Sequence, residues 1–401
     1  MLAEALLLQL GHNATLVAIG AALLGLSAGA TGTFLFLRKR ALVSDAISHA
    51  TLPGVCLAFI VMVALGGDGR NLPGLLAGSV LSAGFGLLVL GWLTRNTRLA
   101  EDAAIGAVLS VFFGFGIVLL TVIQTMGAGR QAGLEGFLLG STAGMLRQDA
   151  LVIAAGGALV LALIFALRRV LMLVAFDPEY ATARGLRVDR IDLLMMGLVM
   201  AVTVVGLKIV GLILIVALLI IPPVTARFWT DRADRVVLLA GAIGGLSGYV
   251  GAAISASAPN LPTGPIIVLV GFAVFGLSLL VAPGRGVLAA VVRHFNYQHR
   301  VHLRQGLLAL AQGQPIYERL TLRLLCRAGL ARQDGVATER GRARAARALR
   351  DETRWQVIRA DQAFETAAAQ YDGLRDIDSV LTADQIAEID RRIGGPQAVP
   401  G

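Results

Sequence analysis

The chain has 401 residues, of which 56% are hydrophobic and 15% charged, and its mean hydropathy is +0.75. Because ordinary soluble domains carry about a quarter charged residues, this composition excludes a soluble enzyme for most of the chain and indicates a membrane protein. The net charge of +9 does not require nucleic acid as a partner, since membrane proteins concentrate Arg and Lys in their cytoplasmic loops.

Apolar segments long enough to cross about 30 Å of hydrocarbon follow one another up to about residue 284. No basic residue precedes Arg38, so the first segment lacks the positive start of a cleavable signal and is predicted to be retained. We expect an all-α integral membrane domain with about nine transmembrane helices over residues 1–284, followed by a charged domain over residues 285–401. The predicted spans are Thr15–Leu37, Ser44–Leu65, Leu72–Thr94, Ala103–Met126, Asp149–Leu167, Ile191–Leu207, Ile209–Arg227, Val236–Ser257 and Pro262–Ala282.

Basic residues gather in alternate connections between these spans. They occupy Arg38–Arg40, Arg95 with Arg98, residues 168–190 and residues 227–235. The positive-inside rule places these connections in the cytoplasm. With nine spans, the N-terminus is then predicted to lie outside and the charged C-terminal domain inside.

Asp45 and His49 lie in the second predicted span, four residues apart and therefore on one helix face. At the helical rise of 1.5 Å per residue, Asp45 lies about 7–8 Å beyond Arg40 and His49 about 14 Å beyond it. Carboxylate and imidazole bind divalent first-row metals, and ionisable groups at this depth usually face a cavity or a partner. From the residues alone, two interpretations of this pair remain open. It could bind a metal, or the two side chains could only be polar partners for each other or for a neighbouring helix.

The connection from Val174 to Asp192 contains the pattern of a short capped helix. Asp177 can cap a helix whose first residue is Pro178, with Glu179 in the first turn and Gly185 as the stop. Such a helix could dock into a partner protein, or it could be an ordinary surface helix in a loop; both readings stay open here.

The chain carries no nucleotide-binding loop of its own. A P-loop needs Gly-Lys-Ser/Thr to hold phosphates, and the two lysines, Lys39 and Lys208, follow Arg38 and Leu207. Transport must therefore be driven by a separate ATPase or by an ion gradient, and the chain is not expected to be an enzyme.

Three segments together carry a resemblance to a known family. They are RKRALVSDAISHATLPGVCLAF (Arg38–Phe59), FDPEYATARGL (Phe176–Leu186) and VVGLKIVGLILIVALLIIPPVTARF (Val204–Phe228). In this order and spacing they resemble the permeases of bacterial manganese, zinc and iron ABC importers, over roughly residues 14–284. The resemblance implies a type II ABC importer fold in the bacterial cytoplasmic (inner) membrane.

The resemblance also implies partners and site residues. The expected partners are a cytoplasmic ATPase that binds the ATP, an extracytoplasmic metal-binding protein, and a second permease copy or a paralogue. No permanently bound cofactor is expected, and Mn²⁺, Zn²⁺ or Fe²⁺ would be the cargo. Asp45 and His49 would contact the metal in transit. The residues that would couple to the ATPase are Phe176, Asp177, Pro178, Glu179, Ala181 and Gly185.

The C-terminal domain resembles iron-dependent winged-helix repressors over Gly329–Asp361, which predicts a small α(+β) domain in the cytoplasm. It departs from them where their metal ligands would lie, because Thr353, Asp378 and Ser379 occupy those positions. The connection between Ala311 and Arg319 is also too short for a complete helix-turn-helix. A degenerate domain that regulates or packs, without binding DNA, is the expectation.

Three alternatives to the metal importer remain at this stage. The first is a secondary metal transporter driven by a proton or sodium gradient through Asp45. The second is a membrane-anchored DNA-binding regulator, whose isolated tail would bind DNA with a steep salt dependence. The third is an ABC importer of iron chelates, whose pore would be large and would not need His49.

Overall fold

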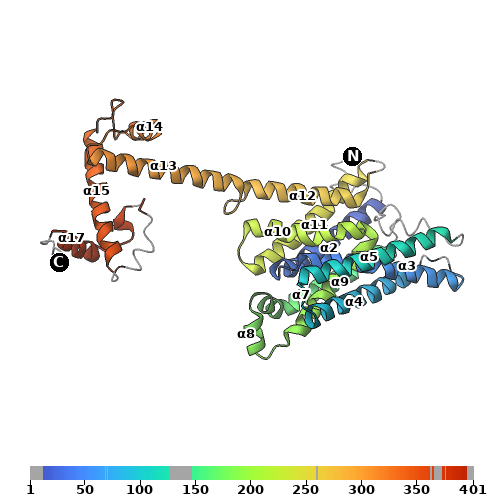
Figure 1. Cartoon of the computed structure of the whole chain (residues 1–401). Coiled ribbons are helices and arrows are strands. Elements are labelled where there is room, and N and C mark those ends of the chain that lie inside the picture. The colour runs from blue at the N-terminus through green and yellow to red at the C-terminus, as the bar shows by residue number, and fades with distance from the viewer. Residues whose placement is uncertain are drawn as a thin grey trace. The chain divides into compact units, whose positions relative to one another are not determined.

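The computed structural model (Figure 1) describes residues 12–394 except 68, 70, 127–146, 259–260, 362–363, 365–372 and 375. The chain divides into two compact units, Met1–Val287 and Leu288–Gly401. Helices form nearly all of the regular structure in the described residues, in which no strand occurs. The all-α expectation is therefore confirmed for the part of the chain that is described.

Among the described residues, eight helices of the first unit are long and apolar enough to cross a membrane, against the expectation of about nine. The ninth expected span corresponds to α10, an apolar helix of 18 residues that follows α9 after a turn at Gly211, where φ is +82°. The helices are α2 (His12–Leu37), α3 (Ala41–Ala64), α4 (Leu72–Asn96), α5 (Glu101–Thr125), α7 (Arg147–Phe176), α8 (Pro178–Ala183), α9 (Val188–Val210), α10 (Leu212–Trp229), α11 (Ala233–Ala256) and α12 (Thr263–Val281).

Helix α7 differs from its prediction, because it does not end near Leu167 but continues to Phe176. Arg168 does not interrupt it, since its guanidinium lies over the ring of Phe165, 4.5 Å from the centroid. Beyond this cation the apolar run VLMLVAF continues the helix, with Leu171 and Val174 fully buried. The connection between α7 and α8 therefore begins at Asp177, nine residues later than Arg168.

Helix α2 lies at the centre of the first unit and packs against α7, α9, α10 and α11. It approaches α11 closely, because a Cβ atom on Gly25 would lie 2.1 Å from the carbonyl oxygen of Gly244. A Cβ on Gly29 would lie 2.2 Å from the carbonyl oxygen of Ala240. Small residues let helix backbones approach in lipid, where van der Waals packing drives association.

The second unit is built from helices around two apolar clusters. One cluster joins Leu307, Leu325 and Leu330, and the other joins Ile358 to Ile389. The helices are α13 (Val287–Ala311), α14 (Arg319–Arg327), α15 (Glu339–Ala360), the 3-10 helix η2 (Ile377–Ser379) and α17 (Ala383–Gly394).

The winged-helix expectation for this unit is not supported. A wing is a β-hairpin, whereas the described residues between α14 and α15 form a single antiparallel bridge between Ala331 and Ala337. The turn at Gly335, with φ +82°, closes after three residues, so the two sides are too short to extend into strands. The expected α(+β) domain is therefore corrected to a helical unit in the described residues.

Candidate metal site and coupling segment

Asp45 and His49 face each other across one turn of α3. The Oδ1 atom of Asp45 lies 3.3 Å from Nε2 of His49, and their side chains are 37% and 16% exposed. Residues on both sides of this pair, including Ser44, Ser48 and Pro53, are buried. The predicted helix face is therefore confirmed, and α3 continues as one helix through Pro53.

His49 keeps one ring nitrogen without a hydrogen-bond partner. Its Nδ1 atom is buried and unpartnered, while its ring packs edge-on against Phe113, with centroids 4.8 Å apart. An unpartnered polar atom in a buried position costs free energy. A carboxylate and an imidazole thus lie together on α3, and both groups are suitable ligands for a first-row divalent metal.

This pair is a sparse ligand set. The described residues contain no group of three or more His, Cys, Asp and Glu side chains that could hold a metal ion. Two side chains from one chain leave most positions of a metal's coordination sphere to water or to another protein copy. The geometry suits brief contact with an ion better than permanent binding.

An ion-pair group, which we call the arginine hub, ties the start of α3 to three other segments. The Asp192 Oδ2 atom lies 2.5 Å from Nη2 of Arg38 and 3.4 Å from Nη1 of Arg40. Arg40 also pairs with Glu101 at 2.7 Å, and Arg38 donates a hydrogen bond to the carbonyl oxygen of Val174 at 3.1 Å. Arg38 thus joins the loop before Asp45 both to Asp192 on α9 and to the end of α7.

Sequence reasoning used the hub's arginines only as markers of the cytoplasmic side and did not single out Asp192. Its Oδ2 atom is engaged by two arginines, while Oδ1 is buried without a partner. The available signal was an acidic residue at the start of a long apolar helix, which is expensive to bury unless a cation lies nearby.

Helix α8 follows the predicted capping pattern. The Asp177 Oδ1 atom accepts a hydrogen bond from the backbone N–H of Tyr180 at 2.8 Å, and Pro178 is the first helical residue. At the other end Gly185 has φ +82°, and Leu186 donates its N–H to the carbonyl oxygen of Ala181. This is the glycine-terminated helix end that the sequence indicated.

The two faces of α8 differ. Ala181 is fully buried against the core of the first unit, so it fixes the helix to the unit. Phe176 and Tyr180 are exposed, as is Glu179. Tyr180 is held by Arg184, whose Nε and Nη2 atoms donate to its hydroxyl at 2.9 and 2.7 Å. The segment therefore presents two aromatic rings and a carboxylate on a fixed support.

Comparison with known proteins shows which family this chain matches. Residues 12–282 match the model of the ABC 3 transport family. The chain belongs to the ABC 3 transport family. It is therefore a multi-pass membrane transport subunit and not an enzyme, in agreement with its missing P-loop.

Individual relatives agree with this assignment. The chain is 40% identical to the manganese transport system membrane protein MntC of Bacillus subtilis, over 80% of this chain and 72% of MntC. It is 38% identical to the zinc transport system membrane protein TroC of Treponema pallidum, over 72% of this chain and 94% of TroC. The solved structure of PsaBC from Streptococcus pneumoniae in complex with a Fab superposes with a TM-score of 0.62 at 32% identity, covering 71% of this chain and 98% of that one.

Proposed function

We propose that the chain is the permease of an ATP-driven importer that moves a divalent first-row transition metal, manganese, zinc or iron, into the cytoplasm. The observation that carries the proposal is the Asp45–His49 pair with its unpartnered Nδ1 atom, in a chain whose relatives are named as manganese and zinc transport proteins. A separate ATPase would hydrolyse ATP, and an extracytoplasmic binding protein would deliver the metal.

Asp45 and His49 contact the ion during passage in this proposal. The negative carboxylate attracts a dication, and the imidazole nitrogen gives preference to transition metals over Mg²⁺ and Ca²⁺. Two ligands per chain bind weakly enough for release, and a second permease copy or paralogue would add its own ligands to the same pathway. The ion is cargo, so neither residue needs to hold it permanently.

The coupling segment Phe176–Gly185 would seat in the ATPase through its exposed aromatic face. A movement of α8 is passed to the end of α7, where Arg38 binds the carbonyl oxygen of Val174. From there the arginine hub leads to Arg40 at the N-cap of α3, five residues before Asp45. This chain of contacts gives ATP hydrolysis a physical route to the metal pair.

The proposed location is the bacterial cytoplasmic membrane, with the coupling segment and the C-terminal unit inside and the N-terminus outside. The basic connections Arg38–Arg40, Arg95 with Arg98 and residues 227–235 support this orientation through the positive-inside rule. Single cysteines introduced at positions 12 and 184 test this orientation. The first should be labelled from outside intact cells, and the second only after permeabilisation.

Uptake by the complex reconstituted with its ATPase tests the proposal. Radioactive manganese, zinc and iron are supplied separately, with the wild type beside His49→Ala, Asp45→Asn and the control Asp102→Asn. Asp102 is exposed at the start of α5, so its loss of charge should leave uptake unchanged. We expect ATP-dependent uptake of at least one metal, and at least a tenfold loss in both site variants.

The outcomes separate the alternatives. Normal uptake by His49→Ala would show that His49 only packs against Phe113, and transport of an iron chelate instead of free metal would favour the chelate importer. Uptake that persists with an inactive ATPase but stops when the ion gradient is dissipated would replace the ABC importer with a secondary transporter.

A further inference from the structure

The second unit contains a half-enclosed cavity of about 820 Å³ that transport does not use. Its walls come from α13, α15 and the segment around η2, all within Leu288–Gly401. Such a volume is typical of small-molecule pockets, which run from about 300 to 1,000 Å³.

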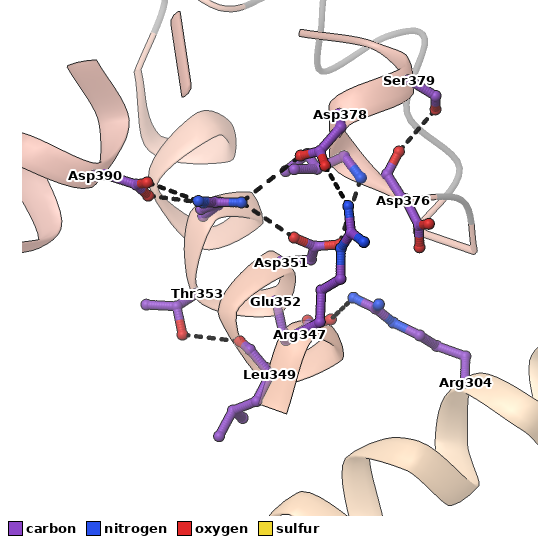
Figure 2. Close-up of polar contacts among 12 residues, drawn as sticks. Arg304, Arg347, Leu349, Asp351, Glu352, Thr353, Asp376, Asp378, Ser379 and Asp390 are labelled. Atoms are coloured by element: carbon purple, nitrogen blue, oxygen red, sulfur yellow. Dashed lines mark hydrogen bonds and ion pairs between the residues drawn. The ribbon is translucent and has the colours of Figure 1, made fainter. Parts of the chain in front are cut away.

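The cavity is strongly cationic. Its lining includes one acidic residue, Asp376, against five arginines, which are Arg300, Arg304, Arg340, Arg344 and Arg347. Two of these have carboxylate partners: Arg304 pairs with Glu352 at 3.3 Å and Arg347 with Asp378 at 2.5 Å. Figure 2 shows both arginines reaching these partners, with Asp376 on the neighbouring segment.

Three guanidinium groups remain uncompensated. In the described part of the chain, the side chains of Arg300, Arg340 and Arg344 make no hydrogen bond or ion pair, and all three residues are exposed to solvent. Arg340 and Arg344 are one turn apart on α15, and Arg300 is on α13 at the other wall. Three like charges around one cavity repel one another, and an anion between them would remove that repulsion.

Arg304 provides a second, independent observation. Its side chain is 11% exposed, and its Nε atom is buried without a hydrogen-bond partner. Among the described residues, its guanidinium makes one hydrogen bond, from Nη2 to Glu352. A guanidinium has five N–H donors, so this nearly buried cation leaves most of its hydrogen-bonding capacity unused at the cavity wall.

The remaining lining is apolar. Leu303, Leu307, Leu330, Ala343 and Ala348 form walls beside the arginines. Guanidinium groups bind phosphate oxygens through paired N–H donors, while aliphatic walls cover an uncharged, flat body such as a nucleoside. A DNA duplex is too wide to enter a cavity of this volume, so the shape favours a small molecule.

We propose that this cavity binds a phosphorylated small molecule of nucleotide size, with the phosphates between Arg300, Arg340 and Arg344. The site uses none of the residues that we propose for metal transport. It gives the C-terminal unit a ligand-binding function that does not depend on a metal site or on DNA.

Titration of the purified full chain, without its ATPase, tests the site. The probe is ADP at about 0.15 M salt, where weak surface attraction is screened, and binding is followed by calorimetry. Pyrophosphate, vesicles containing phosphatidylglycerol and a DNA duplex form the other arms. We expect one saturable ADP site, weakened at least tenfold in Arg340→Ala/Arg344→Ala and in Arg300→Ala, with pyrophosphate binding at the same site.

The matched control is Arg342→Ala, because Arg342 is exposed on the same helix and does not line the cavity. Its ADP affinity should equal that of the wild type. Absence of saturable binding of ADP and pyrophosphate would overturn the proposal. An equal loss in Arg342→Ala, or binding only to vesicles or DNA, would also overturn it and assign the arginines to non-specific surface attraction. The melting temperature of each variant shows whether it is folded, and Arg300→Ala tests the opposite wall independently.

Discussion

The two units of this chain hold their polar groups in opposite ways. In the first unit, the hydroxyls of Ser27, Thr31 and Ser48 donate to carbonyl oxygens of their own helix, three or four residues earlier. In the second unit, long side chains bridge different helices, as when Arg354 on α15 donates two hydrogen bonds, of 2.7 and 2.6 Å, to Asp390 on α17.

The surrounding medium explains the difference. In lipid, apolar side chains gain little free energy by moving from contact with acyl chains into a helix interface. Helices therefore associate through close backbone contact at small residues. In water, a small unit can tolerate charged side chains between its helices, because their outer atoms remain hydrated. Within its helices the first unit therefore depends on shape, and its ion pairs lie near helix starts, whereas the second unit depends on charge between its helices.

The largest effect is expected from Gly25→Ala on α2. A Cβ atom there would lie 2.1 Å from the carbonyl oxygen of Gly244, so two helix backbones must separate. Overpacking usually costs about 1–3 kcal/mol and more where backbone must move, and we expect little folded protein by size-exclusion chromatography in detergent. Gly84→Ala is the control, because nothing lies within 4 Å of its Cβ position; equal recovery of both variants would contradict the close contact.

Asp192→Asn should have the next largest effect, because it removes the charge shared by Arg38 and Arg40. Breaking a largely buried ion pair costs about 3 kcal/mol, so the melting temperature should fall, and ATP-driven uptake should fall with it if the hub couples α8 to α3. Asp189→Asn is the control, since its pair with Arg95 is exposed and such pairs contribute below about 1 kcal/mol. A similar small shift in both variants would remove the hub from the coupling route.

Arg354→Leu tests the second unit. It removes the bidentate bonds to Asp390 and the contact with the fully buried Asp351 at 3.4 Å. Charged hydrogen bonds of this kind contribute about 2 kcal/mol, so amide exchange should quicken in α15 and α17 and stay unchanged in α2 and α11. Arg391→Leu, which loses only a bond within its own helix, should leave exchange as it is in the wild type.

How far the sequence predicts this molecule depends on the range of each interaction. The cap at Asp177, the stop at Gly185 and the Asp45–His49 pair were predictable, because each involves residues within a few positions of one another. The contact of Arg38 with Asp192 joins residues 154 positions apart, and no helical period or cap indicates such a contact. The wing was expected from a resemblance, but a single bridge closes that turn.

The smallest effect is the pH dependence of the second unit. Burial raises the pKa of Asp351 above 3.8, whereas the hydrogen bonds from Arg354 lower the pKa of Asp390 below 3.8. The folded state takes up the proton of Asp351 at a higher pH than the unfolded state does. The free energy of unfolding therefore rises as the pH falls through the raised pKa towards 3.8. For Asp390 the folded state releases its proton more readily, so its contribution is present above 3.8 and is lost as the pH falls through the lowered pKa.

These opposite signs predict different acid profiles for two isosteric variants. Asp351→Asn should lose the gain in stability on mild acidification and keep the loss at lower pH, while Asp390→Asn should keep the gain and lose the later fall. Amide exchange of α15 and α17 between about pH 3 and pH 6, corrected for the intrinsic exchange rate, measures both the gain and the later loss of stability in each variant and in the wild type. Identical profiles for the two variants would show that neither carboxylate sets the acid response, and that the charge network of the second unit is less important for its stability than its two apolar clusters.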